Sequence, residues 1–219
     1  PDDSYARLLL STLLERAGVA GAARMLCERA KAADLSLEYG WVDLRLAVME
    51  GREAETVTFL EEMLEQRRAA GRSTERPVTF LGYMSFRTGD AAEALHWAAM
   101  LEEVSANKVY ADMIRLQALS RTSDASAVRR IIEKNQVAFQ RDWEYCLWLA
   151  MALAQVGEKS AALDWLERSA RLGSCELHLV ETSRDLDPLR ADPRFQEVLS
   201  IIRGRAREII QLAAFAGYR

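Results

Sequence analysis

Few residues of this chain have the type and spacing that catalysis or metal binding requires. The three cysteines, Cys27, Cys146 and Cys175, are far apart and form no C-x-x-C pair. The two histidines, His96 and His178, are isolated from them and from each other. A nucleophile needs a base within reach and a zinc site needs clustered ligands. We therefore expect no catalytic residue, no metal and no cofactor.

Three acids near the C-terminus, Asp185, Asp187 and Asp192, could suggest a cation site. The glycine and glutamate that a calcium loop requires at fixed offsets are absent, however. A proline follows each of the last two acids, which is typical of a helix N-cap followed by proline at the first helical position. We predict that these two acids cap helices, and that a last helix runs from about 193 to 216.

The composition is that of a mainly helical globular protein. Of the 219 residues, 50% are hydrophobic and 28% are charged, and only 4 are proline. The net charge of −4 disfavours direct nucleic-acid binding, which needs a clustered basic surface. No apolar run has the ~18 residues that a membrane span requires. We expect a cytoplasmic protein and, because the chain begins with Pro1 instead of Met, an excised piece of a longer one.

A repeat of about 34 residues organises the chain. Its turn residues are separated by 33, 38, 34 and 34 residues; they are Gly18, Gly51, Gly89, Ser123 and Gly157. Each turn is followed by small and apolar residues at helical spacing, and each is preceded by another apolar helical segment. A unit of two antiparallel helices cannot bury its apolar face alone, whereas a stack of such units can.

This pattern resembles the tetratricopeptide repeat family. The family spacing L-G-x-x-x-x-x-x-G-x-x-x-x-A matches Leu81, Gly82, Gly89 and Ala94, and the resemblance covers about residues 4–172.

The segment that follows resembles the closing segment of bacterial tetratricopeptide regulators. It reads D-P-L-R-A-D-P-R-F over residues 187–195. Such a segment covers the exposed end of the last repeat, and its apolar stripe would be Phe195, Val198, Leu199 and Ile202.

The resemblance implies an all-α protein, a right-handed α-solenoid of about five helix–turn–helix repeats with C-terminal capping helices. We expect a single domain over 1–219. Its repeats would span about 4–36, 37–70, 75–108, 109–142 and 143–173, with the cap at 174–219. The longer spacing before Gly89 falls around 71–77 and is consistent with a longer turn. Trp97, Trp143, Trp148 and Trp165 are expected at helix–helix contacts.

In this family the first helix of each repeat lines a concave groove. Carried over position by position, the groove would present Trp41, Arg45, Tyr83, Arg87, Tyr110, Gln117 and Arg121. The lysine, asparagine and arginine clamp for a terminal carboxylate has no match at these positions. Aromatic anchors with arginines are typical of binding hot spots and suit an acidic or polar peptide segment. The alternative is that these side chains only solvate a helix face.

We therefore expect a protein–protein interaction module, part of a larger bacterial regulatory or signalling protein. Two alternatives stay open. One is a ligand-sensing domain of a transcription regulator. The other is a dimerisation module that pairs through the apolar C-terminal helix, including Ile209 and Leu212.

Overall fold

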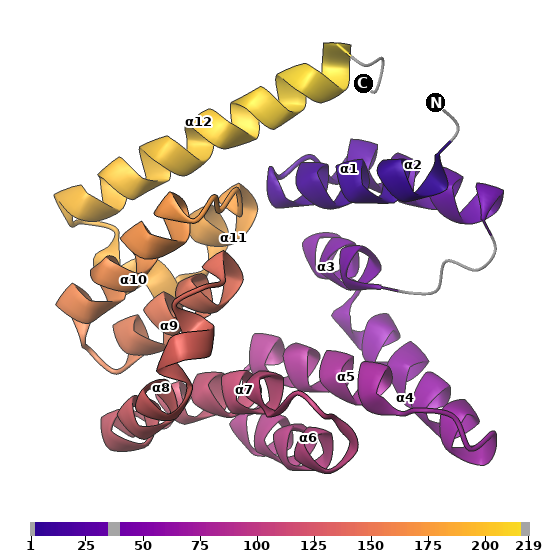
Figure 1. Cartoon of the computed structure of the whole chain (residues 1–219), viewed down its shortest axis with the longest axis horizontal. Helices are drawn as coiled ribbons and strands as arrows, with labels where there is room; N and C mark the ends of the chain where they lie inside the picture. Colours follow the sequence, from indigo (N-terminus) through magenta and orange to yellow (C-terminus); the bar gives the residue numbers. More distant parts are fainter. Residues whose placement is uncertain (1–2, 35–39, 216–219) are drawn as a thin grey trace. The chain divides into compact units, whose positions relative to one another are not determined.

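The computed structural model describes residues 3–34 and 40–215, and within these ranges the chain forms helices and no strand (Figure 1). In chain order they are α1 (Ser4–Arg16), α2 (Ala20–Ala33), α3 (Trp41–Met49), α4 (Glu53–Ala69), α5 (Glu75–Thr88), α6 (Ala91–Val104), α7 (Lys108–Arg121), α8 (Ala125–Phe139), α9 (Trp143–Gln155), α10 (Lys159–Arg171), α11 (Leu177–Thr182), the 3₁₀ helix η1 (Arg184–Leu189) and α12 (Pro193–Phe215). The all-α prediction is confirmed. None of the described helices is long and apolar enough to cross a membrane.

The predicted turn residues adopt the backbone conformation that ends a helix. All five have positive φ, from 60° at Ser123 to 91° at Gly89, and each lies between the two helices of a predicted repeat. At Gly89 the Asp90 N–H donates to the Ser85 carbonyl oxygen at 3.0 Å, which closes the end of α5. The Asp90 carboxylate accepts from the Glu93 N–H at 2.9 Å and caps α6. The turn prediction is confirmed.

The helices group into two compact units. Unit 1 comprises 1–52, 174–183 and 196–219, and unit 2 comprises 53–173 and 184–195. The sequence predicted one domain over 1–219, with 37–70 as one of its repeats. The structure instead divides this repeat, because α3 belongs to unit 1 and α4 packs on α5 in unit 2.

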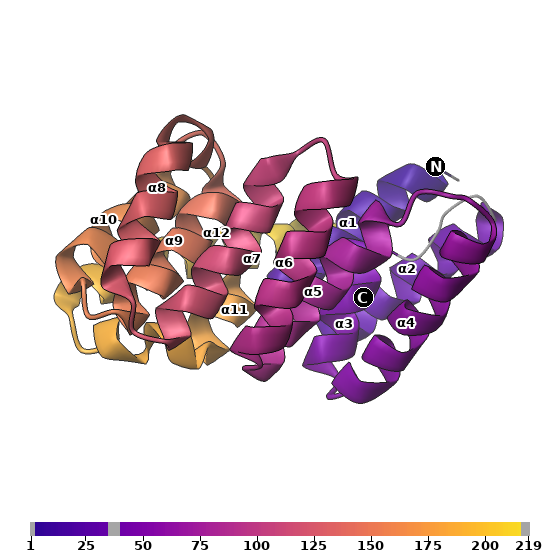
Figure 2. The same ribbon diagram turned by 90° about the horizontal axis from the view of Figure 1, so that it is seen from below.

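Unit 2 contains α4 to α10 and η1. The first helices of its hairpins, α5, α7 and α9, pack against one another, and each also packs on its own hairpin partner (Figure 2). The 3₁₀ helix η1 packs on α9 and α10. The extra length before Gly89 lies partly in α4, which has 17 residues where α6 has 14.

A close helix approach explains why Gly82 stands in the middle of α5. A Cβ atom at this position would lie 2.5 Å from Ile114 Cδ1 and 3.4 Å from Trp97 Cβ. Gly82 therefore lets α5 approach both α6 and α7.

Unit 1 joins segments from both ends of the chain. Its core brings together Leu14 of α1, Leu26 of α2, Leu46 of α3 and Ala213 of α12. Helix α11 packs on α1.

The two predicted caps near the C-terminus have different outcomes. Helix α12 begins at Pro193, and the Asp192 carboxylate accepts from the Arg194 N–H at 2.9 Å, so this cap is confirmed. The cap at Asp187 is wrong, because Pro188 lies inside η1 and Asp187 instead accepts from Arg190 Nε at 2.7 Å.

The tryptophan prediction holds in part. Trp97 and Trp148 are buried, as expected of side chains at helix–helix contacts. Trp143 and Trp165 are only half-buried.

Candidate partner-binding site

The seven residues predicted to line a groove fall in different units. Trp41 and Arg45 belong to unit 1. The other five belong to unit 2, on α5 and α7. Within unit 2 the structure brings together the second group, which in chain order is Tyr83, Arg87, Tyr110, Gln117 and Arg121.

In unit 1 the predicted arginine is part of the interior. Arg45 is 8% exposed, and its Nε donates to Glu15 Oε2 at 2.6 Å. Glu15 is itself buried. The prediction that Arg45 faces a partner is therefore corrected, because a buried carboxylate on α1 already engages it. Trp41 is half-buried at the first residue of α3.

In unit 2 an aromatic cluster joins three helices. Trp148 of α9 lies 5.8 Å from Tyr83 of α5 and 5.7 Å from Tyr110 of α7, measured between ring centroids. Phe86 lies edge-on to both Tyr83 and Trp148. Tyr83 is buried and Tyr110 is half-buried. The cluster is thus a rigid support between α5, α7 and α9, and Tyr83 contributes to it mainly from inside.

Gln117 also has a structural role. Its side chain is buried, and its Nε2 donates to the carbonyl oxygen of Trp148 at 2.7 Å. This bond links α7 to α9 and occupies the amide that was predicted to meet a partner, so the prediction for Gln117 is corrected.

A polar row remains at the C-terminal ends of the same three helices. Arg87, Arg121 and Gln155 each stand two residues before a turn residue with positive φ, in successive hairpins. Both arginines lie in the last turn of their helices, where a cation interacts favourably with the helix dipole.

Part of this row already holds an acidic segment of the same chain. Arg121 Nη2 lies 3.4 Å from an Asp185 carboxylate oxygen, and Gln155 Nε2 donates to the Asp185 carbonyl oxygen at 3.1 Å. Leu186 and Leu189, in the same 3₁₀ helix, are fully buried. The segment is thus bound through a carboxylate, a backbone carbonyl and two apolar anchors. From the sequence, Asp185 suggests only a metal ligand, and Leu186 and Leu189 beside it are the signal for the docked segment.

Arg87 keeps hydrogen-bonding capacity. Its side chain is half-buried, and its buried Nε has no hydrogen-bond partner among the described residues. A buried donor without an acceptor costs about 1–3 kcal/mol. An acceptor supplied by a bound molecule would remove this cost.

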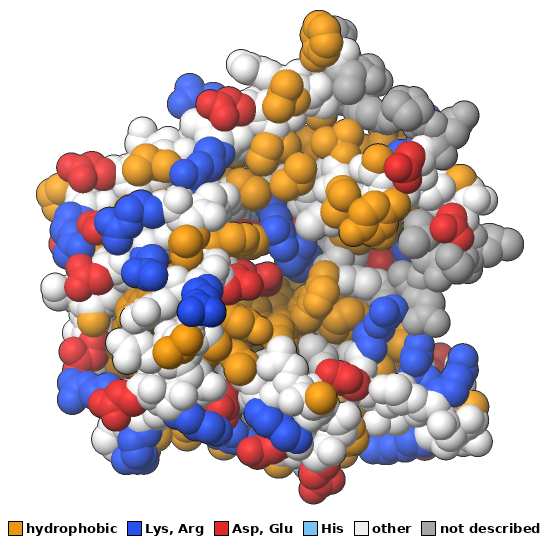
Figure 3. All heavy atoms as spheres, in the orientation of Figure 1, with side chains coloured by type: hydrophobic (Ala, Val, Ile, Leu, Met, Phe, Trp, Pro, Cys, Tyr) orange, Lys and Arg blue, Asp and Glu red, His pale blue; other side chains and the backbone are white. Residues whose placement is uncertain are grey.

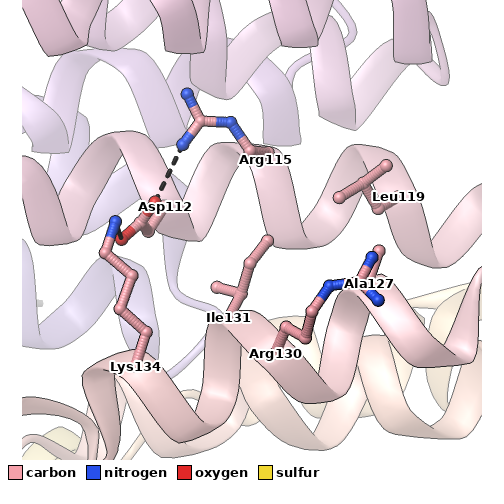
Figure 4. A pocket seen from close by; sticks show the side chains of 7 residues that line it. All are labelled: Asp112, Arg115, Leu119, Ala127, Arg130, Ile131 and Lys134. Atoms are coloured by element: carbon pink, nitrogen blue, oxygen red, sulfur yellow. Dashed lines mark hydrogen bonds and ion pairs between the residues drawn. The ribbon is translucent and has the colours of Figure 1, made fainter.

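A cleft of about 290 Å³ lies elsewhere in unit 2, between α7 and α8 (Figure 4). The buried Asp112 accepts from Arg115, Lys134 and Asn135, each at 2.8 Å. Arg130 lines the cleft farther along α8, and the apolar lining consists of Leu119, Ala127 and Ile131. Since Asp112 engages the amide and two of the cations, this arrangement is better suited to joining α7 and α8 than to holding a ligand.

The groups capable of nucleophilic chemistry are shielded. Burial raises the pKa of the Cys27 thiol to about 11, with the nearby Asp43 adding to the effect. Burial likewise raises the pKa of Cys146 to about 11 and that of Cys175 above its ordinary value. His96 is exposed and stacks edge-on with Trp97. No group of three or more metal-ligating side chains occurs in the described ranges.

Comparison with known proteins adds no assignment: no family model, no curated protein and no solved structure matches this chain.

Proposed function

We propose that this chain is a protein-interaction module and that unit 2 binds an acidic segment of a partner along the row Arg87, Arg121 and Gln155. The proposal extends the resemblance to tetratricopeptide repeats, in which the first helices of the repeats form the binding surface.

One observation carries the proposal. Arg121 and Gln155 already bind Asp185 in cis, through one contact to a carboxylate and one to a backbone carbonyl. Side-chain contacts to both groups are the means by which a surface recognises an extended peptide. The row thus has the chemistry that an acidic peptide requires.

The next position of the row has the same type of side chain. Arg87 repeats the position of Arg121 one hairpin earlier and retains a donor without an acceptor. Hydrogen bonds between a guanidinium and a carboxylate are charge-assisted and stronger than neutral ones. The aromatic cluster keeps α5, α7 and α9 in place, which reduces the ordering cost when a partner binds.

The test is affinity capture from lysate of the source organism, with the whole 219-residue chain immobilised. The test variant is Arg87→Gln/Arg121→Gln, which removes both charges and keeps the side-chain length. Tyr83 is left intact, because truncating a buried ring would destabilise the core. The matched control is Arg130→Gln/Arg141→Gln, two exposed cations of unit 2 outside the row.

We expect the wild type and the control variant to retain a partner protein. The test variant should bind this partner about tenfold less tightly, because two charge-assisted hydrogen bonds are lost. Binding should weaken as salt is raised. Equal retention by all three proteins, with equal melting temperatures, would contradict the proposal.

A further inference from the structure

A second cleft of unit 2 combines an aromatic ring with acidic side chains. It has a volume of about 200 Å³ and is formed by residues of α8, α9 and α10. Sites that enclose a whole small molecule usually measure ~300–1,000 Å³, so this cleft is of a size to take a single side chain. The residues that line it are Arg129, Ile132, Glu133, Leu153, Glu158, Ala161 and Trp165.

The aromatic side of the cleft is Trp165 of α10, which is half-buried. Among the described residues, no ring or cation stacks on it and its indole N–H makes no hydrogen bond. The two buried tryptophans of unit 2 differ, since Trp148 packs against other rings and the indole N–H of Trp97 donates to Glu93. The indole of Trp165 is thus available to a ligand, and indole is the aromatic ring that attracts cations best.

The charge of the cleft is negative. Its one cation, Arg129, forms an ion pair with Glu158. Glu133 is exposed and, within the part of the chain that the structure describes, has no hydrogen bond or ion pair. Lys134, the next residue, pairs with Asp112. On the face drawn in Figure 3, basic and acidic side chains alternate over unit 2, so the groups that line the cleft decide which charge it attracts. The carboxylate of Glu133 is the one left for a ligand.

We infer that this cleft binds an arginine side chain of a partner protein. A guanidinium stacks on an indole and its N–H fork matches a carboxylate, so it can engage Trp165 and Glu133 together. The methylene groups of the same side chain would cover Ile132 and Leu153. A carboxylate ligand would meet Arg129 already paired, and an uncharged ligand would gain nothing from Glu133. The inference does not depend on the row that the proposed function uses.

The first test titrates the whole ¹⁵N-labelled chain with Nα-acetyl-arginine amide and follows the indole N–H signals by NMR. The chain has 5 tryptophans, and the signal of Trp165 is the one that Trp165→Phe removes. We expect this signal to shift and to saturate with a dissociation constant on the order of a few millimolar, as befits a ligand of about 15 non-hydrogen atoms. Nα-acetyl-citrulline amide has the same shape without the charge and should bind about tenfold more weakly.

The second test uses a variant of the carboxylate. Glu133→Gln removes the charge, keeps the side-chain length and should bind the arginine derivative about threefold more weakly. The matched control is Glu103→Gln on α6, which removes another exposed carboxylate without a partner among the described residues and should bind like wild type. Both positions are exposed, so both variants should fold normally.

Three results would overturn the inference. One is a Trp165 signal that does not shift up to about 50 mM arginine derivative, well above the expected dissociation constant. Another is equal binding of the citrulline derivative, or wild-type affinity in Glu133→Gln, because either would show that charge is not recognised. The third is free L-arginine that binds at least about tenfold more tightly than the derivative, which would indicate a site for the free amino acid instead of a partner protein.

Discussion

In each unit, an arginine two residues before a turn residue forms an ion pair with an acidic residue from the C-terminal part of the chain. The two arginines differ in the exposed fraction of their side chains. In unit 1, Arg16 lies 3.0 Å from Glu176 and keeps 18% of its side chain exposed. In unit 2, Arg121 lies 3.4 Å from Asp185 and keeps 29% of its side chain exposed. The repeat position thus determines where an arginine points. The neighbouring carboxylate determines how much of the guanidinium is left for a partner.

The largest effect is expected at the buried pair of unit 1. Arg45→Met should lower the free energy of unfolding by about 3–5 kcal/mol, because it leaves Glu15 charged and uncompensated in the interior. Urea denaturation would measure the loss. Adding Glu15→Gln should recover part of it. If the free energy of unfolding falls by less than about 1 kcal/mol, the Arg45–Glu15 pair behaves like an exposed ion pair. The two units would then not differ in the strength of their ion pairs.

Substitutions at one glycine in each unit test how closely the helices pack there. Gly82→Val should destabilise the protein by about 2–3 kcal/mol, because the new side chain collides with Ile114. Gly204 of α12 has no atom within 4 Å of an added Cβ. Gly204→Ala should therefore stabilise by about 1 kcal/mol through helix propensity. Thermal melts of both variants measure these changes in stability. If Gly204→Ala destabilises the protein, other atoms lie closer to α12 than the structure indicates.

The contact of unit 2 with its own acidic segment should contribute little. Arg121→Gln is expected to cost about 0.5 kcal/mol, the usual value for a partly exposed ion pair. A double-mutant cycle with Asp185→Asn would isolate the interaction. A coupling above about 2 kcal/mol would indicate a structural clamp, and Arg121 would then be a poor candidate for binding a partner.

The smallest effect concerns pH. Burial favours the neutral form of Glu50, but hydrogen bonds from Arg24 and Arg52 outweigh it and lower the pKa of this carboxyl from its ordinary value of 4.5. The stabilisation by Glu50 is therefore fully present above the unfolded pKa and is lost as the pH falls through the folded one. Glu50→Gln should cost less than about 1 kcal/mol at pH 7, and the cost should shrink as the pH falls below 4.5. A cost that stays constant as the pH is lowered until the protein unfolds would exclude this explanation.

Much of the local structure followed from the sequence, because it depends on short-range chemistry. The turn at Gly89 needs positive φ and the start of α12 needs an N-cap, and both are visible in neighbouring residues. The division of the repeat at 37–70 was not visible, since it depends on tertiary packing, of α3 on α1 and α2 and of α4 on α5. Glu38, which the family spacing also places in the groove, lies outside the described residues.

The site was harder to predict than the fold. Tyr83, Tyr110 and Arg121 lie on helices that pack together, α5 and α7. Repeat position predicted that they line a groove. It could not reveal that Gln117 bonds to the backbone of Trp148, or that Arg45 meets Glu15. Such contacts join residues about 30 positions apart and depend on the register between helices, which local patterns do not specify.

The composition of unit 1 has a consequence for synthesis on the ribosome. Its core unites Leu14 with Ala213, nearly the whole chain apart, whereas most of unit 2 is one continuous stretch. Contacts so distant in sequence form slowly, and Ala213 leaves the ribosome long after Leu14. Unit 2 can fold while translation continues, and α1, α2 and α3 can pack on one another early, but the core around Leu14 and Leu26 stays incomplete until Ala213 is available. Nascent chains should therefore be most prone to aggregation, and most dependent on chaperones, just before α12 is complete.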